Sequence, residues 1–156
     1  MVCLVGVLAA IALERLLRYQ ELAEKTAMEQ TVGALRSAQV LQVAGRITQG
    51  GLASVQTLVN DNPMDWLAQR PANYAGAVFD PAPDQVPRGG WCFDLKRREL
   101  VYRPNMTRFF TPAEAGAEQI RFRIVIGLDP PGAAAGRQLT ELTIAPVRPI
   151  RWTPEF

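Results

Sequence analysis

The sequence predicts an α+β fold in which one long N-terminal α-helix packs on a four-stranded antiparallel β-sheet. None of the 12 prolines precedes Pro63, so the region before it can form uninterrupted helix. Apolar residues in that region recur every three or four positions, whereas several later runs alternate with a period of two. Segments rich in glycine and proline separate those runs and mark turns. The 156 residues provide one sizeable core with an appendage.

The helix is predicted from residue 2 to about residue 47, with Gly50 and Gly51 as its stop signal. A helix of about 46 residues is about 69 Å long, which exceeds the diameter of a small domain. One end must therefore project, and we expect it to be the uncharged N-terminal end. This divides the chain into a projecting helix, residues 1–22, and a head, residues 23–156. The apolar residues assigned to the projecting part are Val2, Leu4, Val5, Gly6, Val7, Leu8, Ala9, Ala10, Ile11, Ala12 and Leu13.

The first 13 residues carry no charge and allow three interpretations. As a helix they span about 20 Å, less than the roughly 30 Å of a bilayer core. They could be a signal peptide cleaved after Ala12, although no basic residue precedes them. They could be a core helix of a soluble protein, although the head is too small to surround a segment that is apolar on every face. The third interpretation, which we favour, is that the chain as given lacks its natural start.

The head begins with a short helix or turn over residues 52–60 and a helical turn capped by Asn62. Residues 71–89 are rich in proline, aspartate and glycine and predict a loop. Four strands follow, the first two joined by a basic turn at residues 96–98. The predicted strands cover residues 90–95, 99–103, 119–128 and 139–147, the last placed at an edge or ending at Pro146.

Alternation within these strands gives one face of the sheet to the helix. The side chains expected between the helix and the sheet are large and apolar on the strands, and small or aliphatic on the helix. From the helix we expect Ala34, Leu35, Ala38 and Leu41, and from the head Trp66, Trp91, Phe93, Tyr102, Phe122 and Ile124.

Composition excludes several kinds of chemistry. The chain has no histidine, so it cannot build a Ser-His-Asp or Cys-His site or a histidine-ligated metal site alone. A net charge of +2 gives no reason to expect a nucleic-acid partner. Cys3 and Cys92 are too different in context to predict a disulfide, and Cys92 is expected to be a buried strand residue.

Three groups of charged residues could be read as sites. Asp94 and Glu99 could form an acid–base pair, but we favour a solvated hairpin end. Arg121 and Arg123 could bind an anion, but a solvated sheet face or a contact with a neighbouring subunit is the better interpretation. The loop acids lack the density of oxygen ligands that calcium requires, so no metal and no cofactor is predicted; these acids are Asp61, Asp80, Asp84 and Asp129.

The run VGVLAAIALERLLRYQELAEKTAMEQTVGALRSAQ resembles the N-terminal helix of type IV pilins and type II secretion pseudopilins. Those helices carry a Gly-hydrophobic-Leu-Ala-Ala-Ile-Ala stretch, which corresponds here to the residues from Gly6 to Ala12. The resemblance covers about the first 47 residues. The family's basic leader, its peptidase cleavage site and its first mature residues are absent, and Glu14 stands where many members have proline. The resemblance implies about eight further residues ahead of Met1, which would give a segment long enough to span a bilayer.

The resemblance implies a structural subunit and no enzyme. Such a subunit lies in the bacterial inner membrane by a single pass, with its head in the periplasm, and then enters a filament that can be extracellular. Its partners would be copies of itself or other pilin-like subunits, inner-membrane lipid, and the pilus or secretion assembly machinery, with no nucleic acid. A pilus and a secretion pseudopilus, and a major and a minor subunit, remain open. The rival function is a membrane-anchored periplasmic binding module that does not polymerise, which a head pocket with converging polar groups would favour.

Overall fold

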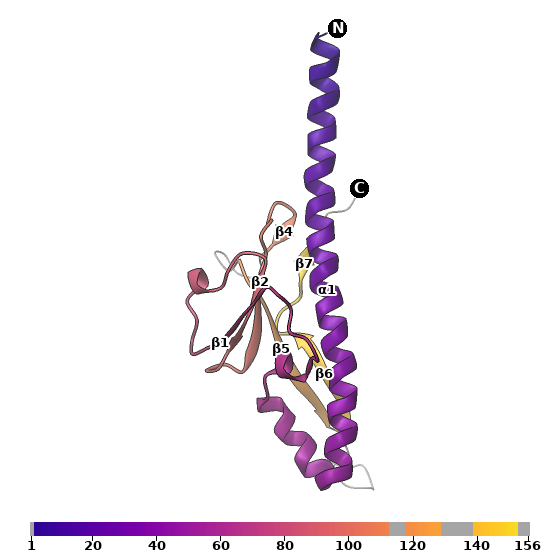
Figure 1. Ribbon diagram of the computed structural model, residues 1–156, viewed down its shortest axis with the longest axis vertical. Coiled ribbons are helices and arrows are strands. Elements are labelled where there is room, and N and C mark those ends of the chain that lie inside the picture. The colour runs from indigo at the N-terminus through magenta and orange to yellow at the C-terminus, as the bar shows by residue number, and fades with distance from the viewer. Residues whose placement is uncertain (1, 113–117, 129–138, 153–156) are drawn as a thin grey trace.

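The computed structural model describes residues 2–112, 118–128 and 139–152. It is an α+β fold, as predicted: the long helix α1 (Val2–Gln56) runs past a β-sheet that lies against its lower half, and its N-terminal part projects beyond the head (Figure 1). The helix is not continuous to its last residue. Gly51 has φ 67° and ψ −162°, a conformation that glycine adopts at little cost.

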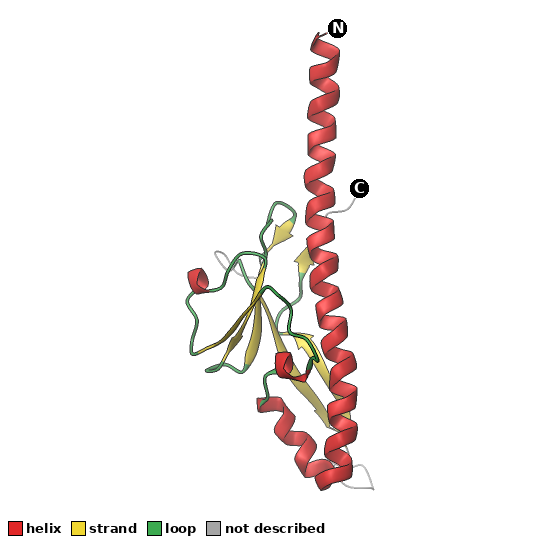
Figure 2. Cartoon of the chain, in the orientation of Figure 1, coloured by secondary structure: helices red, strands yellow, loops and turns green. Residues whose placement is uncertain are grey.

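The predicted stop at Gly50 and Gly51 is therefore confirmed as a break in the helix. Beyond the break, the last residues of α1 fold back beside the helix that precedes Gly50, which we call the long leg. They are followed by the 3-10 turn η1 (Thr57–Asn60) (Figure 2). Contacts of Arg46 join the segments before and after the break. The hydroxyl of Ser54 donates to the carbonyl of Arg46 at 2.7 Å, and the Arg46 guanidinium lies 3.2 Å from Asp61.

Five strands form the main sheet, in the order β1-β2-β3-β5-β6. The four predicted strands are present as an antiparallel series: β2 (Gly90–Asp94), β3 (Glu99–Arg103), β5 (Ile120–Leu128) and β6 (Leu139–Pro146). The last of these lies at the edge of the sheet and ends at Pro146, as expected.

The prediction of four strands was wrong by one. The fifth strand, β1 (Tyr74–Val78), lies in the segment expected to be a loop and pairs in parallel with β2. Its centre is Ala-Gly-Ala, which lacks the β-branched and aromatic residues that signal a strand, so its pairing depends on the neighbouring strand. The remaining elements are short: η2 (Pro63–Trp66), η3 (Pro83–Gln85), and a two-stranded pair of β4 (Phe110–Thr111) with β7 (Arg151–Trp152).

The sheet face toward α1 carries the large apolar side chains that alternation assigned to it. Trp91, Phe93, Tyr102, Phe122 and Ile124 are all buried. Cross-strand neighbours share this face, as in the pairing of Trp91 with Tyr102. Trp66 is only partly buried, at the margin of the core, because the capped turn that begins at Asn62 directs Met64 inward instead.

The helix face in the core differs from the one predicted. Leu35 is fully buried and Ala38 is partly buried, but Ala34 is exposed and Leu41 is 73% exposed. The buried face consists of Met28, Val32 and Leu35, a neighbouring stripe of larger side chains. Side chains of that size fill the space between a helix and a sheet, which alanine cannot do.

Polar side chains extend the buried face toward the end of the long leg. The guanidinium of Arg36 donates to the carbonyl of Ile144 at 3.0 Å from Nη2 and 3.2 Å from Nε. The amide of Gln39 donates to the carbonyl of Leu142. Both carbonyls belong to the edge strand β6, so the helix satisfies backbone groups that would otherwise face water.

Candidate functional site

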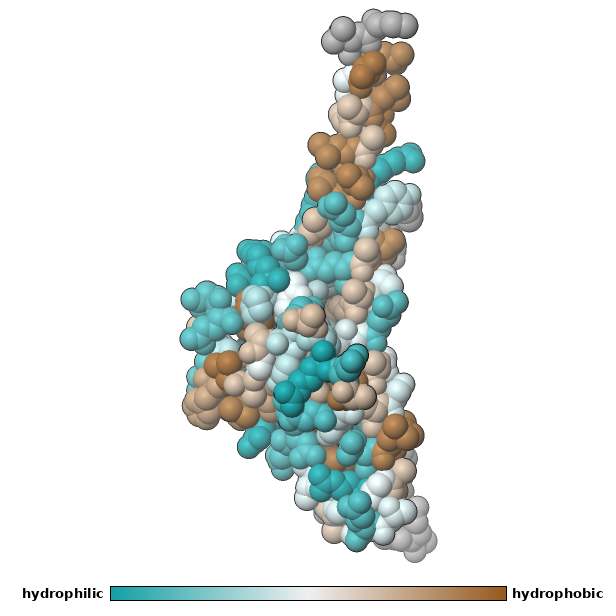
Figure 3. Space-filling model, in the orientation of Figure 1, coloured by the Kyte–Doolittle hydropathy of each residue, from teal (hydrophilic) through white to brown (hydrophobic). Residues whose placement is uncertain are grey.

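The projecting part of α1 is the most apolar exposed surface of the molecule. Its large side chains have no partner among the described residues of the head: Leu4 and Val5 are each 66% exposed, and the residues that follow stay exposed as far as Leu16. The space-filling view shows this segment as a hydrophobic column standing clear of a mainly hydrophilic head (Figure 3). Among the described residues, no helix combines the length and the hydropathy needed to cross a bilayer.

Residues of the head contact the helix at positions closer to the N-terminus than the predicted boundary at residue 22. Glu21 is buried, and its Oε1 accepts from the backbone N–H of Phe109 at 2.9 Å and from the indole N–H of Trp152 at 2.8 Å. Arg18 lies over the ring of Phe109, 5.4 Å from its centre. These contacts join residues almost 90 or more positions apart, which no local pattern reveals.

Glu24 holds the same loop one turn further along the helix. Its carboxylate accepts from the backbone N–H groups of Asn105 and Met106 at 2.5 Å and 3.0 Å, and from the Tyr102 hydroxyl at 2.9 Å. Burial raises the pKa of Tyr102 well above its usual value, and the hydrogen bond to Glu24 raises it further. Tyr102 therefore acts as a donor that links the sheet to the helix.

The side of α1 that faces away from the sheet forms a second exposed surface, which we call the outer stripe. Its residues recur every three or four positions, and all are exposed and uncharged. Val40, at 66%, and Leu41 are the most exposed of them. The stripe consists of Leu16, Tyr19, Ala23, Ala27, Gln30, Ala34, Ser37, Val40, Leu41, Ala44 and Thr48.

The interval from Leu16 to Thr48 does contain charged residues, but none of them belongs to the outer stripe. Ala34 and Leu41, which the sequence assigned to the core, are members of it. The uncharged character of this face is therefore not explained by packing within the head. Exposed apolar side chains gathered on one helix face are typical of surfaces that contact other molecules.

The opposite face of the sheet contains an ionic network where a solvated hairpin end was expected. Asp94 and Glu99 are buried. Arg121 bridges them, with Nη1 at 3.1 Å from Asp94 and 3.2 Å from Glu99, and Arg123 also pairs with Glu99. The expectation of solvated acids was thus wrong, because residues of β5 lie beside the β2–β3 hairpin and neutralise it. Of the two arginines, Arg121 is partly buried, whereas Arg123 is exposed, as a solvated sheet face predicts.

The hairpin turn completes this network at the surface. The backbone N–H groups of Lys96 and Arg97 donate to Asp94 at 3.0 Å and 3.1 Å. The Lys96 ammonium donates to Asp80, and this hydrogen bond holds the pKa of the Asp80 carboxyl below its usual value. Every carboxylate in the network therefore accepts a hydrogen bond from a side chain or backbone donor.

Cys92 is buried in β2, as expected, on the same side of the sheet as Val86 and Val101. Burial raises the pKa of its thiol, and the neighbouring Asp94 carboxylate raises it further. Both effects favour the thiol over the reactive thiolate. Among the described residues, no three side chains of the metal-ligating kinds come together.

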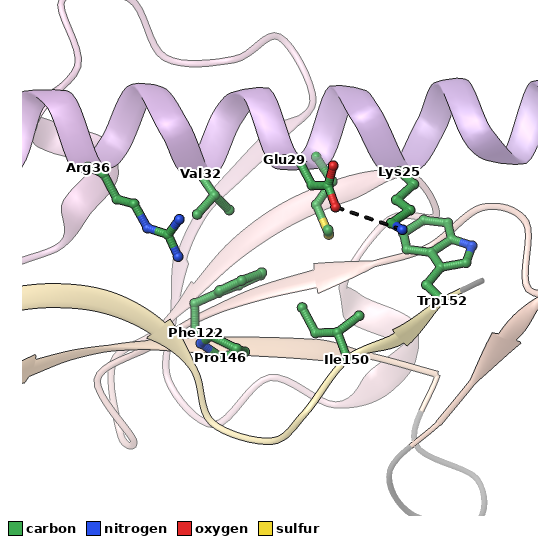
Figure 4. Close-up of a pocket in the computed structure, with 9 residues that line it drawn as sticks. Lys25, Glu29, Val32, Arg36, Phe122, Pro146, Ile150 and Trp152 are labelled. Carbon is green, nitrogen blue, oxygen red and sulfur yellow. Dashed lines mark ion pairs between the residues drawn. The ribbon is translucent and has the colours of Figure 1, made fainter. Parts of the chain in front are cut away.

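A groove of about 380 Å³ lies between α1 and the segment that joins β6 to β7 (Figure 4). Met28, Val32 and Phe122 contribute apolar surface from the core. Lys25 and Glu29, 4.0 Å apart, and Arg36 lie on its helix side. The groove also takes in Pro146, Ile150 and Trp152. The groove is a candidate ligand site in the head, because apolar and charged side chains meet in it.

Comparisons with protein-family models, with curated proteins and with solved structures gave no match to this chain.

Proposed function

We propose that this chain is a structural subunit of a pilin-like or pseudopilin filament, held in the bacterial inner membrane by its N-terminal helix before it assembles. The filament would belong to a type IV pilus or to type II secretion machinery, with the head in the periplasm or on the outside of the filament. The sequence resemblance supports this class. The observation that carries the proposal is the outer stripe of α1.

The outer stripe extends far beyond the segment that a membrane would bury. Val40 and Leu41 lie beside the head, more than 20 residues past the last apolar residue of the projecting part. A plain anchor gives no reason for large exposed apolar side chains at that position. A neighbouring helix does, because burying each of them would contribute about 1.5–3 kcal/mol.

Small residues on the outer stripe suit close contact between helices. Ala23, Ala27, Ala34 and Ala44 let two backbones approach, and no charge has to be removed from water. Two copies shifted along their helix axes can place the projecting part of one against the outer stripe of the other. Such an interface joins two different surfaces and does not close on itself, so it continues into a filament.

The test compares one substitution at two exposed valines. Val40→Glu places a charge on the outer stripe, whereas Val125→Glu places it on β5, where the side chain is 45% exposed. Assembly of the full chain would be followed by sedimentation and by electron microscopy. We expect the wild type and Val125→Glu to assemble and Val40→Glu to remain dispersed, with all three showing similar thermal unfolding.

Assembly of Val40→Glu at the wild-type level would contradict the proposal, as would a wild type that never associates. The second result would favour the alternative function, a membrane-anchored periplasmic binding module that does not polymerise. The groove beside Phe122 is the specific observation on its side, because apolar and charged side chains meet there.

A further inference from the structure

The loop that follows β1 presents an exposed aromatic side chain, Phe79. It is 69% exposed, more than any other large apolar side chain described in the head outside α1. The backbone around it is held in place. Just before it, the carbonyl of Val78 accepts from the N–H of Leu95 at 2.9 Å, and just after it Pro81 and Val86 are buried. An exposed aromatic ring on a fixed backbone loses little conformational entropy on binding, so it is typical of the residues that dominate an interface.

The groove between α1 and the segment that joins β6 to β7 can receive a ring of this kind. Its volume of about 380 Å³ lies within the range of pockets that hold small ligands. Its apolar floor is fixed before anything binds, because the indole N–H of Trp152 donates to Glu21 at 2.8 Å and the Phe122 ring packs on Trp91. Figure 4 shows Phe122 and Ile150 directed toward α1. A hollow with a preformed apolar floor buries an aromatic ring more completely than a convex helix surface does.

Phe79 and the groove lie at opposite edges of the main sheet. Phe79 directly follows β1, the first strand in the sheet order, whereas Pro146, which lines the groove, ends β6, the last strand. The ribbon view shows the other strands of the sheet between them (Figure 1). Phe79 therefore does not reach the groove of its own chain, and a contact between the two requires a second copy.

The charges on the two surfaces are weakly complementary. Residues 79–87 contain two aspartates and no basic residue. One aspartate pairs with the basic turn of the β2–β3 hairpin, and the other, Asp84, is exposed. On the helix side of the groove, two basic side chains, Lys25 and Arg36, accompany one acid, Glu29. Because such exposed pairs contribute little energy, the charges would orient the contact while the ring supplies its strength.

We infer that Phe79 of one copy inserts into the groove of a neighbouring copy. This rests on the proposed function and adds to it a contact made by the heads instead of the helices. Since the inserted ring and the groove are different surfaces at opposite edges of the sheet, the contact passes from each copy to the next without closing. Head and helix contacts within one assembly reinforce each other, because forming either one raises the effective concentration for the other.

Photo-crosslinking of the full chain tests where the ring lies. The photoreactive residue p-benzoylphenylalanine replaces Phe79, and a mixture of isotope-labelled and unlabelled chains is irradiated under assembly conditions. Mass spectrometry should then find crosslinks between copies that end in the groove, at Met28 or Ile150. The matched control carries the same photoreactive residue at Val125, which is 45% exposed on β5 and should not crosslink to the groove.

A substitution tests what the ring contributes. Phe79→Ala should raise the critical concentration for assembly about tenfold to 100-fold, the change expected when burial of one phenyl group is lost. Because Phe79 is exposed in the single chain, thermal unfolding of the variant should match that of the wild type. Val125→Ala is the control for this measurement and should leave the critical concentration unchanged.

Filaments whose crosslinks from position 79 end only outside the groove would overturn the inference and leave the proposed function standing. Assembly of Phe79→Ala at the wild-type critical concentration would do the same. Groove crosslinks between copies that never grow into filaments would support the inference and count against the proposed function. A wild type that does not associate at all would overturn both, so the two proposals can fail separately.

Discussion

Phe122 connects the sheet, the helix and the groove, and truncating it to alanine tests the packing most directly. Its side chain is buried and lies opposite Leu100, with its ring centre 5.8 Å from that of Trp91. Loss of a buried phenyl group costs about 3–5 kcal/mol. Phe122 also borders the groove, so solvent or Met28 can take part of the vacated space. We therefore expect a loss near the lower end, about 3 kcal/mol.

Chemical denaturation followed by tryptophan fluorescence would measure this loss of unfolding free energy. Thermal unfolding should show a fall of about 6–12 °C in Tm for a domain of this size. Val125→Ala on the exposed side of the same strand is the control and should change stability by less than about 0.5 kcal/mol. A loss below about 1 kcal/mol for Phe122→Ala would mean that the face of β5 toward α1 does not carry the core.

Three further perturbations address other parts of the head. Glu21→Ala should destabilise the fold by about 2–4 kcal/mol, because it leaves the donors of Phe109 and Trp152 buried without their acceptor; denaturation that shows no loss would refute that role. The free energy of unfolding should fall as pH rises above about 10, since the unfolded chain then releases the Tyr102 proton that the folded chain retains, and Tyr102→Phe should reduce this slope in alkaline titrations. Alkylation of Cys92 at neutral pH should be slow in the folded chain and fast in urea, because the thiol is buried and its pKa is raised; equal rates would show that β2 opens readily.

Local pattern was sufficient for much of the fold. The proline-free start, the glycine pair at the break, the Asn62 cap and the alternation in β2, β3, β5 and β6 are signals confined to a few neighbouring residues. The short strand β1 was not predictable in this way, because its small residues join the sheet only when β2 is beside them. The ionic network could not be predicted from local sequence either, because Asp94 and Arg121 lie on different strands and meet only when β2, β3 and β5 have paired.

The choice of helix face shows a different limit. Two neighbouring stripes of α1 are both largely apolar. The stripe in the core includes the polar residue Gln39, which makes that stripe less hydrophobic and so less recognisable as a core face. The alanine-rich stripe therefore looked equally suitable for the core. Helical periodicity identifies apolar faces but does not say whether the partner is the chain's own sheet or another molecule. The exposure of Leu41 shows that this stripe does not pack on the chain's own sheet.

The hydrogen bonds from Arg36 and Gln39 to β6 have a consequence for how copies of this chain can associate. A sheet with open edges can recruit strands from other molecules, which leads to aggregation. Here helix side chains occupy two carbonyls of one edge strand, those of Leu142 and Ile144, and the other edge strand, β1, is short and irregular, with Gly76 at φ 102°. Uncontrolled growth through strand pairing is disfavoured at both edges. In the proposed filament, this would let heads lie close together without pairing through their sheets.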